Sequence, residues 1–418
     1  MEERIVVTGG RPLNGSVKIP AAKNSVLPLF AASLLCTGEV RLQAVPRLAD
    51  VEHCMALLRG VGCAARWEGS DAVLSGPPAN STLPGQTAGQ MRASILFCAP
   101  LLARLGRAET SLPGGCRIGA RPIDLHLAAL RELGAEITER YGELRCKAKC
   151  LRGTDITLAI PSVGATENAI LAACGAEGTS VIYNAAREPE IVDLQALLRS
   201  MGARVNGAGG SIITVEGGAA LHGCTHRVIG DRIVCATYLC AAAAAGGEVR
   251  LTGVDYRAVS TVALSLAESG CEVRSEADAV SLRSTGALRS VRPVRTAPYP
   301  GFPTDAQPVL MAALLRSEGC TVFVENIFEN RYRHVDELSR MGAEIRVAGR
   351  VAVVNGVRTL HGAAVKCTDL RGGAALVIAG LSAEGTTRVT ELTHIDRGYD
   401  AIERDLAALG AQIRRETT

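Results

Sequence analysis

Aromatic residues are scarce in this chain. Only 3% of its 418 residues are Phe, Trp or Tyr, which argues against binding by stacked aromatic side chains. An excess of one charge is also lacking, because 45 Lys and Arg against 42 Asp and Glu leave a net charge of +3. The longest charge-free apolar runs, 24–38 and 233–247, have 15 residues each, fewer than the roughly 18–20 that cross a bilayer. We therefore expect neither a nucleic-acid partner nor a membrane-spanning segment.

The N-terminal residues Met1-Glu2-Glu3-Arg4 have no apolar segment of the kind found in secretory signals. The chain has fourteen cysteines, and many of them, such as Cys98, Cys174 and Cys240, lie in apolar stretches where cysteine behaves as a small hydrophobe. These features predict a reduced, cytoplasmic protein. The sequence leaves the oligomeric state open, and a monomer is compatible with it.

The chain is built from an internal repeat. A phrase of the form Leu-x-x-Leu/Met-Gly-Ala recurs six times with some drift, and its glycines are spaced by 72, 68, 68, 72 and 68 residues. Six repeats of about 70 residues therefore account for the whole chain. The glycines of this phrase are Gly62, Gly134, Gly202, Gly270, Gly342 and Gly410.

Each repeat alternates helix and strand patterns. Ala- and Leu-rich segments with helical spacing end at a glycine, the residue that most readily takes the left-handed conformation of a helix end. Short β-branched runs such as 321–324 and 344–347 follow and read as strands. The order predicted is strand–helix–strand–helix–strand–strand, with strands joined through helices largely parallel. A solenoid used only for binding has the same kind of pattern, so function must be sought in residues that interrupt the repeat.

Three side chains interrupt the repeat in ways that suit chemistry. Lys23 opens an apolar helix, where the helix dipole disfavours a cation unless an anion lies nearby, although Asn24 could be a plain N-cap and Lys23 a surface lysine. Cys116 lies in a Gly-rich loop with two arginines, which would lower its pKa towards neutrality, unless it is merely an exposed thiol. Asp305 follows a proline-stiffened segment as a candidate general base, or, with Thr304, as an N-cap.

Arginines and small residues supply candidate anion sites. Arg92 precedes an apolar helix, and Arg331, Arg371 and Arg397 fall in connections of the last two repeats. If those connections share one face, the three arginines would converge there on a small polyanion. The turn 162–166 could present backbone N–H groups to a phosphate. No Walker A sequence and no dinucleotide-binding glycine pattern is present.

Taken together, these phrases resemble the enolpyruvyl transferases, and among them the UDP-N-acetylglucosamine 1-carboxyvinyltransferase family. The resemblance runs from residue 5 to about 415. A departure occurs at Gly230 and Val234, where this family usually has Pro and Glu, close to the expected domain crossing near residue 230. The phrases that carry the resemblance are 20–24, 91–94, 111–126, 162–166, 184–193, 295–305, 329–331, 368–371 and 394–399.

The resemblance implies a fold and a domain division. The fold class is α/β, a two-domain inside-out α/β barrel of six βαβαββ-like repeats. One three-repeat domain would span 22–229 and carry the Cys116 loop. The other would combine 1–21 with 230–418 and carry Asp305 and Arg397. The active site of this family lies in the cleft between its two domains.

The resemblance also implies a reaction: the enolpyruvyl group of phosphoenolpyruvate passes to the 3′-hydroxyl of UDP-N-acetylglucosamine, and phosphate leaves. Cys116 is then the acid, Asp305 the base, and Lys23, Arg121 and Arg397 hold phosphoenolpyruvate with support from Arg331 and Arg371. No metal or organic cofactor is implied. The residues that match substrate contacts are Lys23, Asn24, Arg92, Arg121, Pro122, Ile123, Asp124, Leu125, Ser162, Val163, Gly164, Asp305, Ile327, Arg331, Arg371 and Arg397.

Two other functions remain open at this point. The shikimate-pathway enolpyruvyl transferases share the repeat architecture, although the Cys116 loop is foreign to them. A catalytically silent relative that only binds a sugar nucleotide is the second alternative. The joint presence of Cys116, Asp305, Lys23 and Arg397 argues against a silent protein, which has no need of all four.

Overall fold

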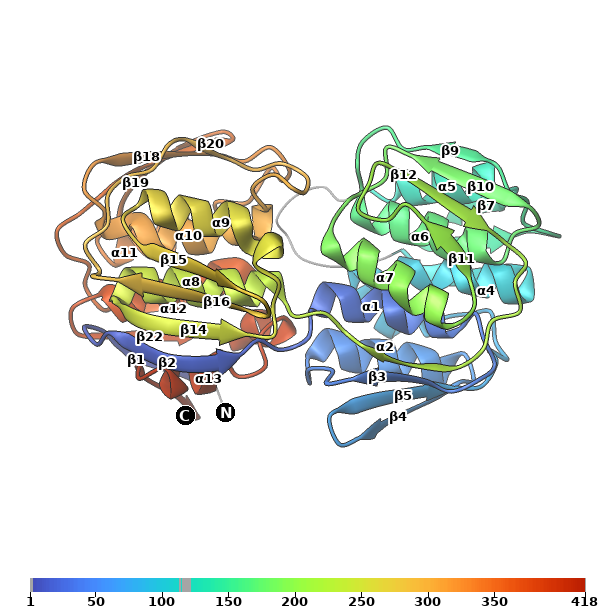
Figure 1. The fold of residues 1–418 in the computed structure, drawn as a ribbon, viewed down its shortest axis with the longest axis horizontal. Coiled ribbons are helices and arrows are strands. Elements are labelled where there is room, and N and C mark those ends of the chain that lie inside the picture. The colour runs from blue at the N-terminus through green and yellow to red at the C-terminus, as the bar shows by residue number, and fades with distance from the viewer. Residues whose placement is uncertain (1–2, 113, 115–121, 418) are drawn as a thin grey trace. The chain divides into compact units, whose positions relative to one another are not determined.

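The computed structural model describes residues 3–112, 114 and 122–417. They form two compact units, which we call the split unit, residues 3–20 with 230–417, and the middle unit, residues 21–229 without the undescribed positions. No helix within the described ranges combines the length and hydrophobicity needed to cross a bilayer. Figure 1 shows helices and strands alternating along the chain, as the sequence predicts for an α/β fold.

The middle unit contains the elements that follow, with η denoting a 3₁₀ helix. Its helices are α1 (Lys23–Ser33), α2 (Ala49–Gly60), α3 (Gly85–Gln90), η1 (Arg92–Phe97), α4 (Cys98–Leu105), α5 (Asp124–Glu132), α6 (Val163–Cys174) and α7 (Pro189–Ser200). Its strands are β3 (Val40–Gln43), β4 (Ala64–Glu68), β5 (Asp71–Ser75), β6 (Arg107–Ser111), β7 (Glu136–Arg140), β8 (Glu143–Lys147), β9 (Asp155–Thr157), β10 (Thr179–Tyr183), β11 (Arg204–Asn206), β12 (Ile212–Glu216) and β13 (Cys224–Arg227).

The split unit begins with two strands from the start of the chain. Its helices are α8 (Arg232–Ala245), α9 (Tyr256–Glu268), η2 (Thr304–Ala306), α10 (Gln307–Ala313), η3 (Leu314–Arg316), α11 (Val335–Arg340), α12 (Leu370–Ser382), η4 (Leu392–Arg397) and α13 (Ile402–Ala408). Its strands are β1 (Glu3–Thr8), β2 (Leu13–Lys18), β14 (Gly247–Thr252), β15 (Glu272–Glu276), β16 (Ala279–Ser284), β17 (Val294–Arg295), β18 (Cys320–Val324), β19 (Glu344–Ala348), β20 (Val351–Asn355), β21 (Ala364–Lys366), β22 (Thr386–Thr390) and β23 (Gln412–Thr417).

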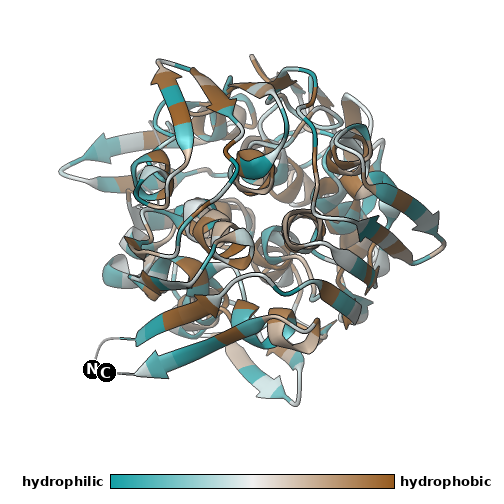
Figure 2. Cartoon of the chain, turned by 90° about the vertical axis from the view of Figure 1, so that its left-hand side faces the viewer, coloured by the Kyte–Doolittle hydropathy of each residue, from teal (hydrophilic) through white to brown (hydrophobic). Residues whose placement is uncertain are grey.

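Buried helices form the centre of the split unit. Residues 233–244 of α8 and 371–382 of α12 are buried on every side, and both helices pack against α10. Helices that are apolar all round belong in an interior. By contrast, α9 buries only Val259, Val262, Ala263 and Leu266, one stripe of an amphipathic helix. Each unit therefore has helices inside and strands outside, the inside-out arrangement expected, and hydrophobic and hydrophilic residues alternate along the outer strands (Figure 2).

The strands form three separate sheets in each unit, and among the described residues these do not join into one closed barrel. Strands joined through a buried helix are parallel neighbours, as β9 and β10 are. The last strand of a repeat, however, inserts between its predecessors, so β12 pairs antiparallel with both β10 and β11. The expectation that strands joined through helices run parallel is therefore confirmed for pairs such as β9/β10, β17/β18 and β21/β22. The antiparallel pairs come from the hairpin that ends each repeat, whose two strands no helix joins.

Three repeats borrow a strand from a distant part of the chain. β13 pairs parallel with β3, and β2 pairs parallel with β14. β1 lies between β22 and β23 and pairs antiparallel with both. The second repeat has a three-stranded sheet, β6, β8 and β7. All six glycines of the repeated phrase have positive φ, between 92° and 108°, which confirms them as helix ends.

Candidate functional site

Asp305 lies in η2, directly before α10 in the split unit. Its carboxylate accepts a hydrogen bond from Arg331 Nη2 at 2.8 Å and another from Arg371 Nη2 at 3.3 Å. Both arginine side chains are buried, whereas the Asp305 side chain keeps 30% of its surface exposed. The structure thus fixes one partly open carboxylate on two buried cations. A carboxylate that keeps an exposed edge can exchange a proton with a bound molecule.

The two arginines reach Asp305 from different elements. Arg331 lies between β18 and α11, while Arg371 lies in the first turn of α12 and not, as expected, in a connection. A cation in a first turn opposes the helix dipole. Asp369 compensates, because it is the N-cap of α12 and its carboxylate accepts from the backbone N–H of Arg371 at 3.1 Å. Asp305 itself caps no helix, so the reading as an N-cap is wrong for Asp305 and for Thr304.

The guanidinium group of Arg371 contacts Asp305 and Tyr399, yet two of its nitrogen atoms make no hydrogen bond. Burial alone would lower its pKa, but Tyr399 and Asp305 raise it above the ordinary value, so the guanidinium keeps its charge. The guanidinium also lies 5.4 Å from the centre of the Tyr399 ring. Its Nε and Nη1 atoms are buried with no hydrogen-bond partner. Unmet guanidinium donors are costly, and an anion placed beside them would relieve that cost.

Arg397 is the last residue of η4, which packs against α12, the helix that carries Arg371. It is therefore in a helix as well, not in an open connection. Arg415 fixes this segment, because its Nη2 and Nη1 atoms donate to the Asp396 carboxylate at 2.6 and 3.1 Å. Glu391 and Ala401 flank the segment with φ near 60°, a conformation that non-glycine residues adopt at a cost. The backbone around Arg397 is thus held in an unusual shape.

Lys23 opens α1 in the middle unit and is only 7% exposed, so the reading as a surface lysine is wrong. Its Nζ lies 2.5 Å from a carboxylate oxygen of Asp50, in the first turn of α2. The negative charge of Asp50 offsets the unfavourable interaction between Lys23 and the positive end of the α1 dipole. The N-cap of α1 is Ala22 and not Asn24, and Ala22 makes no side-chain capping hydrogen bond.

The segments assigned to the sugar nucleotide meet in the middle unit. Arg92 Nη2 donates to the Pro122 carbonyl at 2.7 Å, which joins the start of η1 to the start of α5. Ser162 is the N-cap of α6 and is followed by Val163 and Gly164. A Cβ at Gly164 would lie 2.8 Å from Cε1 of His126, so only glycine lets the first turn of α6 approach α5 this closely. The assigned residues of α5 and its preceding turn are Pro122, Ile123, Asp124 and Leu125.

Cys116 and Arg121 lie outside the described residues, so their assignments stay predictions. Ile327 lies in the turn after β18, where its backbone N–H donates to Oε1 of Glu325 at 2.8 Å. Sequence reasoning gave no role to Asp50, Asp369 or Glu325. An acid at the start of an apolar helix signals Asp50 and Asp369 as caps or charge partners. A glutamate directly after a β-branched strand is a common pattern, so the sequence around Glu325 does not predict a role for this residue.

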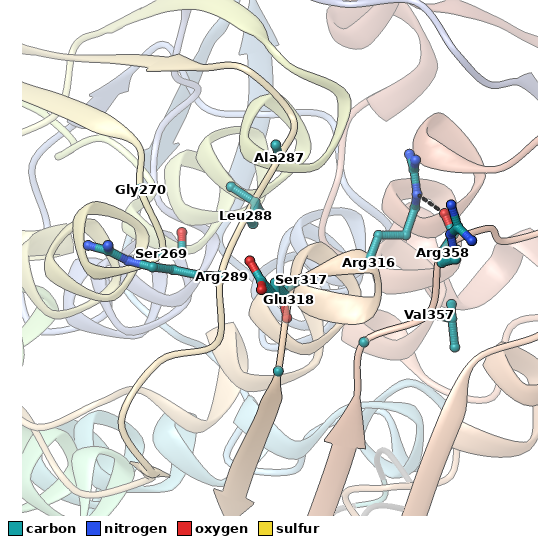
Figure 3. Close-up of a pocket in the computed structure, with 12 residues that line it drawn as sticks. Ser269, Gly270, Ala287, Leu288, Arg289, Arg316, Ser317, Glu318, Val357 and Arg358 are labelled. Carbon is teal, nitrogen blue, oxygen red and sulfur yellow. Dashed lines mark hydrogen bonds between the residues drawn. The ribbon is translucent and has the colours of Figure 1, made fainter.

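A pocket of about 680 Å³ lies elsewhere on the split unit (Figure 3). None of the residues assigned to the substrates lines it. Arg316 donates there to the carbonyls of Arg358 and Ser382 at 3.4 and 3.1 Å, and Ser382 ends α12. A cation at a helix C-terminus has this capping role. Arg289 points away from the other two arginines (Figure 3), so the pocket does not gather charge around one ligand.

Comparisons with known proteins identify the family of the chain. The family model of EPSP synthase (3-phosphoshikimate 1-carboxyvinyltransferase) matches residues 7–406. A UDP-N-acetylglucosamine 1-carboxyvinyltransferase of Gluconacetobacter diazotrophicus is 48% identical over 417 residues, 99% of each chain. The enzyme with the same name from Zymomonas mobilis is 49% identical over 423 residues, again 99% of each chain.

Solved structures give the same answer for the fold. The enolpyruvyl transferase NikO of Streptomyces tendae superposes with a TM-score of 0.89 at 25% identity, covering 100% of this chain and 99% of that one. An EPSP synthase of Acinetobacter baumannii gives 0.77 at 18% identity, with both chains fully covered, and at that identity it supports the fold alone. On these grounds, above all the near-complete alignments at 48–49% identity, the chain belongs to the UDP-N-acetylglucosamine 1-carboxyvinyltransferase family of enolpyruvyl transferases.

Proposed function

We propose that this protein transfers the enolpyruvyl group of phosphoenolpyruvate to the 3′-hydroxyl of UDP-N-acetylglucosamine and releases phosphate. This is the first committed step of peptidoglycan synthesis, which takes place in the cytoplasm. The observation that carries the proposal is the Asp305 carboxylate, partly open and held by two buried arginines, in a chain of this family. A carboxylate with fixed orientation and an open edge is what deprotonation of a sugar hydroxyl requires.

The chemistry is an addition followed by an elimination. C2 of phosphoenolpyruvate becomes electrophilic only when C3 gains a proton, which the Cys116 thiol supplies. Asp305 takes the hydroxyl proton while the sugar oxygen bonds to C2, giving a tetrahedral adduct. The adduct then loses a proton from C3, the C2–O bond to phosphate breaks, and the double bond returns. Each step is a proton transfer or the making or breaking of a C–O bond, and no atom changes its net oxidation state, so the proposal needs no metal and no organic cofactor.

Cations hold the small substrate in this proposal. Lys23, Arg121 and Arg397 bind the charged groups of phosphoenolpyruvate, because a multiply charged anion needs several donors. Arg331 and Arg371 support them by fixing the base, since both donate to Asp305. The unpaired Nε and Nη1 atoms of Arg371 give this arginine further capacity for an anion.

The sugar nucleotide contacts combine helix starts with single side chains. The starts of α5 and α6 are helix N-termini, whose first-turn backbone N–H groups lie outside the intrahelical ladder and suit a diphosphate. Arg92 stabilises the turn before α5 through the Pro122 carbonyl. The residues that we assign to UDP-N-acetylglucosamine are Arg92, Arg121, Pro122, Ile123, Asp124, Leu125, Ser162, Val163, Gly164, Asp305 and Ile327, and Asn24 joins Lys23 beside phosphoenolpyruvate.

One assay separates the three candidate functions. Phosphate release from phosphoenolpyruvate is measured with UDP-N-acetylglucosamine and, in parallel, with shikimate 3-phosphate. We expect release with the sugar nucleotide only. Release with shikimate 3-phosphate only would assign the chain to the shikimate pathway. Binding of the sugar nucleotide without release from either acceptor would identify a silent binding protein.

A further inference from the structure

Glu325 is a fully buried acidic residue directly after β18, with 0% of its surface exposed. Burying a carboxyl group without hydrogen bonds costs several kcal/mol. A protein keeps such a group where every oxygen is satisfied, and the partners then show what it holds in place. In Glu325 both oxygens have partners on three separate stretches of the chain.

Four donors surround the Glu325 carboxyl group. Oε1 accepts from Thr296 Oγ1 at 3.0 Å and from the backbone N–H groups of Ile327 and Phe328 at 2.8 and 3.1 Å. Oε2 accepts from Thr304 Oγ1 at 3.0 Å. One side chain therefore ties the residue after β17, the start of η2 and the turn after β18 to each other.

Two of these contacts lead to residues assigned to the reaction. Thr304 precedes Asp305, and its carbonyl accepts from Arg331 Nε and Nη2 at 3.2 and 2.9 Å. Thr304 is thus held on both sides, its hydroxyl by Glu325 and its carbonyl by Arg331. Ile327, which we assign to the sugar nucleotide, has its backbone N–H fixed by the other oxygen of Glu325.

Thr296 makes the arrangement rigid. Its hydroxyl donates to Glu325 and accepts from the backbone N–H of Asn326 at 2.8 Å, while its carbonyl accepts from Asn326 Nδ2 at 3.0 Å. The turn 325–328 therefore cannot shift against the segment that leads to Asp305 without losing several buried hydrogen bonds.

We propose that Glu325 is a positioning residue for the transfer reaction. Through Thr304 and Ile327 it keeps the Asp305 base aligned with the sugar hydroxyl that the base deprotonates. The proposal rests on the proposed function. Misplacing a reacting group by about 1 Å costs on the order of 100-fold in rate, so the loss of this side chain acts on turnover and on the sugar nucleotide more than on phosphoenolpyruvate.

The test compares two substitutions at position 325. The amide in Glu325→Gln can still accept three hydrogen bonds at Oε1 and donate to the Thr304 hydroxyl, so we expect kcat within about threefold of wild type. Glu325→Ala removes all four contacts. For it we expect a kcat about 10- to 100-fold lower and a higher KM for UDP-N-acetylglucosamine, with the KM for phosphoenolpyruvate little changed.

A control in the adjoining strand distinguishes positioning from stability. Thr321 in β18 is fully buried, and its Oγ1 accepts from the backbone N–H of Val291 at 3.2 Å. Thr321→Val removes that buried hydrogen bond away from Asp305. We expect it to lower the melting temperature while kcat and both KM values stay near wild type. If it reproduces the kinetic pattern of Glu325→Ala, the effect is general destabilisation and the proposal is wrong.

Thr304→Val keeps the proposal testable if Glu325→Ala does not fold. It removes only the contact to Oε2 and should lower kcat several-fold. Normal kinetics in Thr304→Val, or in a folded Glu325→Ala, would overturn the positioning role while the wild type stays active. A wild type that releases no phosphate with UDP-N-acetylglucosamine would instead refute the proposed function itself.

Discussion

Replacing Asp305 with Asn tests the proposed base most directly. The Asn carbonyl can still accept from Arg331, but its amide would point a second donor at Arg371 Nη2. Arg371 would then lose its remaining carboxylate contact, since its Nε and Nη1 atoms already have no hydrogen-bond partner. An unmet buried donor costs about 1–3 kcal/mol. For a unit of this size, that lowers the melting temperature by roughly 2–12 °C and leaves the fold intact at room temperature.

The effect on turnover should be larger. Loss of a general base lowers kcat by about 10²–10⁴-fold, which corresponds to roughly 3–5 kcal/mol of transition-state stabilisation. The assay is phosphate release at saturating phosphoenolpyruvate and UDP-N-acetylglucosamine, with binding of the sugar nucleotide checked by calorimetry. We expect binding to persist while turnover collapses.

A matched control exists in the same unit. Asp255 is the N-cap of α9, and its carboxylate accepts from Arg257 Nη2 at 2.6 Å, so Asp255→Asn also removes an arginine-paired carboxylate. It should leave turnover unchanged. If Asp305→Asn keeps near-normal turnover and only melts earlier, Asp305 merely braces two arginines and the reasoning about the base is refuted.

Three further predictions follow from single residues. Arg397→Ala should weaken phosphoenolpyruvate far more than UDP-N-acetylglucosamine in calorimetry, and equal losses would make this arginine structural. Fosfomycin should alkylate Cys116 selectively, because burial raises the pKa of other thiols, such as that of Cys63 to about 11, and so lowers their reactivity. The alkylation should also be faster with UDP-N-acetylglucosamine present. Labelling spread over several cysteines, or slowed by the nucleotide, would contradict this prediction. Burial lowers the pKa of His334 from 6.5 to about 4. Between these pH values the unfolded state binds more protons than the folded state, so the free energy of unfolding falls as pH falls. From pH 7 to pH 5, the free energy of unfolding of His334→Gln, measured by urea titration, should fall by about 2 kcal/mol less than that of wild type, and an equal fall in both proteins would refute the prediction.

Local features of the fold could be predicted from the sequence, and long-range ones could not. A glycine after a Leu-rich segment ends a helix through its own backbone, so Gly62 and its five counterparts were predictable from neighbours alone. Strand partners are a different matter, because a β-branched run does not reveal which distant run completes its sheet. The placement of β1 between β22 and β23, and the insertion of each last strand, therefore came only from the structure.

The same limit applies to the site. Lys23 stood out because a cation at a helix start needs an anion, and Asp50 provides it. Arg331, Arg371 and Asp305 each stood out alone, but their meeting depends on three separate segments. The residue type of Asn24 also permits an N-cap, but the cap position of α1 is two residues earlier, at Ala22. Glu325 has no recognisable local sequence signal, since the contacts that tie it to Asp305 come from the distant residues Thr296 and Thr304.

The borrowed strand β1 has a consequence for the order in which the nascent chain can fold. Everything in the middle unit is encoded contiguously, so its sheets can be completed once β13 has been synthesised. β1 is made first but pairs with β22 and β23, and Val7 faces Thr387, 380 positions later. Until then β1 is an unpaired strand with exposed edges, the kind of segment that invites mispairing. The start of the split unit is therefore synthesised long before the rest of that unit, and the middle unit can fold while β1 is still unpaired.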